Sequence, residues 1–167
     1  MEKARDIYIK VKGNNHSYTA QAHTNVGYVQ HRMGKNEDAL NSFKTALGVV
    51  EEVKGEENNE EAKANAYTNI GMVLESMQEL DGSIFHHTIA LGMLKKLYGK
   101  YSPAVAKSHH SIGSVLLAKC DYDKALFELE QAKTIFEMTL GSEYDDTIAV
   151  VADIEKCENQ KYEDKLQ

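Results

Sequence analysis

The segment SIGSVLLAKCDYDKALFELEQAKTIFEMTLG, residues 111–141, contains two apolar patterns of helical spacing, one on each side of a short polar turn. Before the turn, Ile112 and Val115 lie three residues apart; after it, Leu129 and Phe136 lie seven apart. Such spacing places apolar residues on one face of a helix. The segment therefore predicts two amphipathic helices that pack against each other as an antiparallel pair.

The same pattern returns at a nearly fixed period along the chain. Four glycines lie 42, 44 and 42 residues apart, and an alanine stands nine residues before each of them. These residues are Gly13, Gly55, Gly99 and Gly141, with Ala4, Ala46, Ala90 and Ala132. A second set consists of Gly27, Gly71 and Gly113. Internal periods of this length indicate repeat architectures, and small residues let packed helices approach to about 8 Å.

The unit resembles the tetratricopeptide repeat, which has a Leu-Gly pair in its first helix and an alanine, an aromatic residue and an alanine in its second. The pair reads Val26-Gly27, Ile70-Gly71 and Ile112-Gly113, and the second-helix pattern reads Ala39, Phe43, Ala46 and Ala125, Leu129, Ala132. The period of about 42 and the helix ending Ile135, Glu137, Leu140, Gly141 are similar to the kinesin light chain type. HEAT and armadillo repeats also fit the period, but they do not explain the paired glycine and alanine columns.

The resemblance implies an all-α fold, a right-handed α-α superhelix (TPR-like solenoid) of antiparallel helix pairs. We expect a single domain over residues 1–167. Its parts would be an unpaired second helix at 2–13, helix pairs at 17–55, 61–99 and 103–141, and a C-terminal capping helix at 145–164. Within the pairs, Gly34 is expected to end one helix, Asn36 and Asp121 to cap helices, and Ser102-Pro103 to begin one.

Composition narrows the function. The chain has 167 residues, a net charge of −7 and a pI of about 5.5, which argues against nucleic acid as a partner. No apolar run of 18 residues is present, and residues 1–12 lack the apolar run of a signal peptide, so we expect no membrane insertion. Two cysteines, Cys120 and Cys157, do not form a disulfide framework and favour a reduced, cytoplasmic location.

In such a superhelix, as the resemblance implies, the first helix of each pair lines a concave groove. Helical spacing then places polar side chains on the face opposite the second helix. The predicted peptide-binding residues are Gln21, Thr24, Asn25, Tyr28 and Arg32 in the first groove helix, Asn65, Thr68, Asn69 and Met72 in the next, and Lys107, His110 and Ser111 in the third. His31, Glu75, Ser114, Asp153 and Lys156 fall in line with them.

Asn25 and Asn69 occupy the same column of the repeat, one residue before the hydrophobic–glycine pair, where the later units have Ser111 and Asp153. An asparagine amide can pair with both groups of a peptide unit. The resemblance implies that these asparagines hold the backbone of a bound peptide. The alternative is that they are solvated or bond a neighbouring helix, and Tyr28 could likewise serve packing between groove helices.

Catalytic chemistry finds little support. Seven histidines are present, but the doublets His86-His87 and His109-His110 would point about 100° apart on a helix, so neither presents both rings to one metal ion. No zinc, redox, nucleophile-elbow or P-loop motif occurs. We therefore predict no enzyme activity, no cofactor and no metal. The favoured function is binding of a linear peptide in the groove, as an adaptor or scaffold. The alternative is a segment of a longer array, or a scaffold that self-associates through the helix at 2–12.

Overall fold

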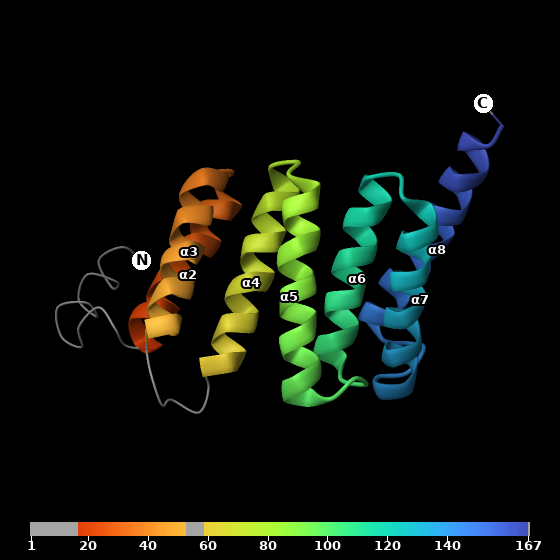
Figure 1. Ribbon diagram of the computed structural model, residues 1–167. Helices are drawn as coiled ribbons and strands as arrows, with labels where there is room; N and C mark the ends of the chain where they lie inside the picture. The colour runs from red at the N-terminus through yellow and green to blue at the C-terminus, as the bar shows by residue number, and fades with distance from the viewer. Residues whose placement is uncertain (1–16, 53–58, 167) are drawn as a thin grey trace. The chain divides into compact units, whose positions relative to one another are not determined.

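The computed structural model describes residues 17–52 and 59–166, which form seven α-helices and no strand (Figure 1). The helices are α2 (Ser17–Arg32), α3 (Asn36–Glu52), α4 (Asn59–Ser76), α5 (Leu80–Tyr98), α6 (Pro103–Ala118), α7 (Tyr122–Thr139) and α8 (Asp145–Asp164). The all-α prediction is confirmed. The helix predicted at 2–13 lies outside the described residues. None of the seven described helices combines the length and apolar character that crossing a membrane requires.

The chain divides into two compact units, Met1–His86 and His87–Gln167, and the division falls inside α5. In the first unit α3 packs against both α2 and α4, and in the second unit α7 packs against both α6 and α8. Within their units, α3 and α7 thus each contact the helix before them and the helix after them. The expectation of one domain over the whole chain stays a prediction.

The turns between paired helices share a left-handed residue. Gly34 ends α2 as predicted, with φ of +74°, and its N–H donates to the His31 carbonyl at 2.8 Å. Gln78 and Cys120 take the same place in the next two turns, with φ of +62° and +60°. A side chain makes this conformation costly, so the fold imposes strain at two positions where a glycine would fit.

The predicted helix starts have mixed outcomes. Ser102 caps α6 by accepting from the Val105 N–H at 3.4 Å, with proline at the first helical position, as expected. The predicted Asn36 cap is wrong: α3 begins at this residue, and its Oδ1 contacts His31 Nδ1 at 3.0 Å. Asp121 precedes α7 without making a capping bond, because its carboxylate instead accepts from Lys124 Nζ at 2.7 Å.

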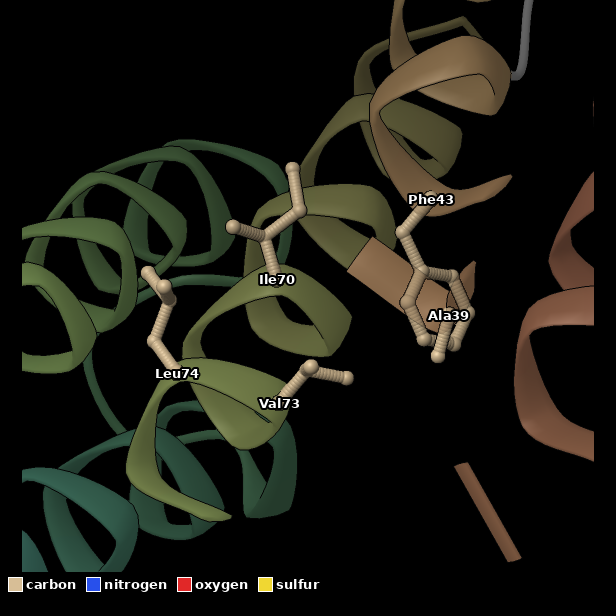
Figure 2. Packing of buried hydrophobic residues seen from close by; sticks show 5 residues of the cluster. All are labelled: Ala39, Phe43, Ile70, Val73 and Leu74. Atoms are coloured by element: carbon tan, nitrogen blue, oxygen red, sulfur yellow. The ribbon is translucent and has the colours of Figure 1, made fainter. Parts of the chain in front are cut away.

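Buried residues of α3 and α4 form a core cluster in the first unit (Figure 2). Its members are Ala39, Phe43, Ile70, Val73 and Leu74. Ala39 and Phe43 belong to α3, and the other three, which Figure 2 also labels, belong to α4, so this cluster joins one helix pair to the first helix of the next. Burial of a valine, leucine, isoleucine or phenylalanine side chain stabilises the fold by roughly 1.5–3 kcal/mol.

The glycine column marks close helix approach, as the sequence predicts. A Cβ placed on Gly113 in α6 would lie 2.7 Å from Leu129 Cγ in α7. Real Cβ atoms do not tolerate such a distance, so the residue opposite can be large only because position 113 has no side chain. In α8 the same column holds Glu155, which is exposed.

Candidate functional site

One face of α2 carries an exposed polar row. Gln21, Asn25, Tyr28 and Arg32 follow one another at helical spacing and are all exposed, whereas Val26 is buried. Within the row, Gln21 Nε2 donates to Asn25 Oδ1 at 3.3 Å. All four were predicted peptide-binding residues, and the structure places them on one accessible face.

The hydroxyl groups of the two predicted threonines form hydrogen bonds within their own helices. The Thr24 hydroxyl donates to the Ala20 carbonyl and the Thr68 hydroxyl to the Ala64 carbonyl, each at 3.0 Å. Their single hydroxyl protons are therefore already used, and each keeps only acceptor capacity for a ligand. Both side chains are half-buried.

The remaining α4 residues separate into exposed and packed positions. Asn65 is exposed. Met72 is half-buried and packs against the core cluster, so this packing explains why an apolar residue stands at this position. Glu75 is also half-buried, and this burial raises the pKa of its carboxyl group.

Asn69 is buried, with 5% of its surface exposed, and it bonds the neighbouring first helix. The Tyr28 hydroxyl donates to Asn69 Oδ1 at 2.7 Å, while the Tyr28 ring meets Phe43 edge-on with centroids 5.4 Å apart. Asn69 Nδ2 is buried and has no hydrogen-bond partner among the described residues. Of the two roles considered for this asparagine, the structure thus displays the bond to a neighbouring helix.

Two of the three predicted α6 residues in the second unit have partners on α8. Lys107 Nζ lies 3.1 Å from Asp146 Oδ2, and His110 Nε2 lies 2.7 Å from Asp153 Oδ2. The Ser111 hydroxyl donates to the Lys107 carbonyl of its own helix at 3.0 Å. These three residues therefore already have polar partners within the second unit.

The contact of Ser114 with Asp153 repeats that of Tyr28 with Asn69. The Ser114 hydroxyl donates to Asp153 Oδ2 at 3.3 Å, and both residues stand in the same repeat columns as the first pair. In each pair the partners are separated by three residues less than the period. Sequence reasoning missed these contacts, although this offset between neighbouring first helices was the signal that could have found them.

The histidines have structural surroundings. His109 is buried, and its Nδ1 lies 2.5 Å from Glu128 Oε2 of α7, so it packs against the second helix of its pair. His86 stacks on Tyr67 with centroids 5.7 Å apart; burial, and secondarily the charge of Lys44, lowers its pKa. Across residues 17–52 and 59–166, no three His, Cys, Asp or Glu side chains are grouped so as to hold a metal ion.

Comparison with known families and structures agrees with this architecture. The model of the tetratricopeptide repeat family matches residues 1–52 and 63–148. No curated protein matches the sequence.

Several solved structures share the fold at low identity. BtubC (BKLC) from P. vanneervenii has a TM-score of 0.78 and 12% identity over 95% of this chain and 61% of its own. The apo form of RapI has a TM-score of 0.78 and 19% identity over 93% and 41%. The TPR-like repeats of a putative kinesin light chain from Podosopora anserina have a TM-score of 0.77 and 14% identity over 97% and 77%. The chain thus spans less than two thirds of the first two proteins.

Proposed function

This chain belongs to the tetratricopeptide repeat family, and from that premise we propose that it binds a linear peptide segment of a partner protein, as an adaptor or scaffold. Repeats of this family generally mediate protein–protein interaction and are typically non-catalytic. We propose neither enzyme activity nor a cofactor for this protein. We also propose that it acts in the cytoplasm, binds no nucleic acid and does not insert into a membrane.

The observation that carries the proposal is the exposed row of Gln21, Asn25, Tyr28 and Arg32 on α2. Two amides and a guanidinium offer donors and acceptors along one helix face. Tyr28, whose hydroxyl proton is donated to Asn69, adds an apolar ring among them. An extended peptide presents a donor and an acceptor at every residue, at a rise of about 3.3 Å. The exposed Asn65 on α4 adds a further amide within the same unit.

The other predicted residues have supporting roles in the proposal. Thr24 and Thr68 can accept hydrogen bonds, and Met72 supplies an apolar boundary. On α6, the proposal keeps Lys107, His110 and Ser111 as a separate set in the second unit. The acidic partners of Lys107 and His110, which are Asp146 and Asp153, would have to exchange with groups of the peptide.

The test compares binding by the wild type and by Asn25→Ala with Asn65→Ala. A displayed library of random 12-residue peptides is selected on the wild type, and affinities of the enriched peptides are measured by fluorescence anisotropy. Loss of two amide contacts is expected to weaken binding by about tenfold or more. Asn41→Ala is the matched control, because Asn41 is an exposed asparagine on α3. Unchanged affinity of the double variant, with the control also unchanged, would remove this face from the proposal.

A second candidate function, a segment that extends an array, is favoured by Ile148 on α8. This side chain is 54% exposed, whereas the residues in its repeat column, Ala20, Ala64 and Ala106, are at most 4% exposed. In the earlier units this column is covered, so the α8 face can accept another helix. Sedimentation velocity across a hundredfold concentration range tests self-association. A mass that stays monomeric throughout would count against a self-associating scaffold.

A further inference from the structure

The bond between Tyr28 and Asn69 joins an exposed residue to a buried one. Tyr28 is 42% exposed, and Asn69 is 5% exposed. The phenol donates to Oδ1 at 2.7 Å, so the carbonyl oxygen of the asparagine amide already accepts a hydrogen bond from within the protein.

The other half of the same amide is unused. Asn69 Nδ2 is buried without a hydrogen-bond partner among the described residues. A buried amide donor left unpaired costs free energy, and native proteins pair nearly all such groups. The amide is therefore half-satisfied in the ligand-free protein, and an acceptor brought to Nδ2 would be bound favourably.

A peptide unit offers the complementary pair of groups. Its N–H could donate to Oδ1 and its carbonyl could accept from Nδ2, which would satisfy both halves of the asparagine at once. The Tyr28 hydroxyl competes with the first of these bonds, because it already donates to Oδ1. Its ring is held separately by the edge-on contact with Phe43, so the hydroxyl can be removed without removing the ring.

We propose that the Tyr28 hydroxyl is an internal competitor for the Asn69 amide, which an extended peptide must displace in order to bind. This inference rests on the proposed peptide-binding function and adds a closed state to it. Only molecules in which the hydroxyl has left Oδ1 are competent to bind there. The measured affinity is accordingly lowered by the fraction of molecules in the closed state.

The test uses Tyr28→Phe, which deletes the hydroxyl and keeps the ring. Peptides selected from the random 12-residue library on the wild type and on Tyr28→Phe are titrated against both proteins. We expect Tyr28→Phe to bind about twofold to tenfold more tightly, since one hydrogen bond no longer competes. Tyr162→Phe is the matched control, because Tyr162 is an exposed tyrosine on α8. The control is expected to leave the affinity unchanged.

A second measurement localises the effect. The side-chain amide signals of Asn69 in ¹⁵N-labelled protein should shift when a selected peptide is added, and should do so at lower peptide concentration in Tyr28→Phe. Equal or weaker binding by Tyr28→Phe, or signals of Asn69 that do not respond to bound peptide, would overturn the inference and leave the proposed function standing. A library that yields no binding peptide on either protein would overturn both.

Discussion

The aromatic ring of Phe43 occupies the space that a side chain at position 27 would need: a Cβ on Gly27 would lie 2.8 Å from Phe43 Cε1. The glycine belongs to α2 and the phenylalanine to α3, so this contact sets how closely the first described helix pair approaches. Phe43 is fully buried and cannot retreat into solvent.

Gly27→Ala is therefore expected to lower the free energy of unfolding by about 1–3 kcal/mol, because overpacking forces the ring or the helices to shift. Urea denaturation followed by circular dichroism measures the change. Gly48→Ala is the matched control, since nothing lies within 4 Å of a Cβ at this helical position. The control should gain about 0.5–1 kcal/mol, because alanine favours helix over glycine. A destabilisation of equal size in both variants would contradict the steric explanation.

Gln78→Gly should stabilise the protein. Gln78 has φ of +62°, where a side chain costs roughly 1–2 kcal/mol and glycine does not. For a chain of this length, about 1 kcal/mol corresponds to a rise in Tm of roughly 2–4 °C. Gln78→Ala retains a Cβ and serves as the control. If both variants shift Tm equally, the backbone conformation is not the cause.

Glu75→Gln should stabilise the protein at neutral pH. Burial raises the pKa of the Glu75 carboxyl in the folded state above its ordinary value of 4.5, so the folded protein holds this proton more tightly than the unfolded chain. Stability contributed by the protonated form is present below pH 4.5 and is lost as pH rises through the folded-state pKa. Thermal melts should show a higher Tm for the variant at pH 7 and a difference that shrinks towards pH 4. A constant difference at every pH would exclude ionisation as its origin.

The two cysteines should differ in reactivity with a thiol reagent such as DTNB. Cys120 is exposed, whereas Cys157 is fully buried, and this burial raises the pKa of its thiol. Because the thiolate is the reactive form, Cys157 should react far more slowly than Cys120 in the folded protein. In the variant Cys120→Ser only the Cys157 thiol remains. In urea, the rate at which DTNB labels this thiol should equal the rate of unfolding. Rapid labelling of Cys157 in native buffer would show that α8 opens from the second unit.

The helices and the close approach of paired helices at glycines could be predicted from the sequence, because apolar periodicity and small residues depend directly on backbone structure. The glycine positions gave the close approach at Gly27, and Ser102-Pro103 gave the start of α6. The left-handed conformations of Gln78 and Cys120 could not be predicted, because no glycine stands at these positions. The turn geometry imposes a positive φ on residues that do not favour it.

The site could be predicted only in outline. Helical spacing correctly grouped the exposed residues of α2, since orientation on one helix follows from position alone. It did not reveal that Asn69 is bonded by Tyr28, because that contact depends on how two first helices are offset, which only a comparison between repeat units can indicate. The peptide-binding role of the twelve residues stays a prediction that the binding experiments above address.

The offset contact between successive first helices also bears on how such a chain can be rebuilt. Tyr28 meets Asn69, and Ser114 meets Asp153, so each hydroxyl is matched to a partner that belongs to the following unit. If whole units were duplicated or exchanged, a tyrosine could face an aspartate or a serine an asparagine across the new junction. A segment for transplantation should therefore begin and end within a first helix, between its acceptor column and its donor column. Such a segment contains both the donating hydroxyl and the residue that accepts from it, so the pair is kept.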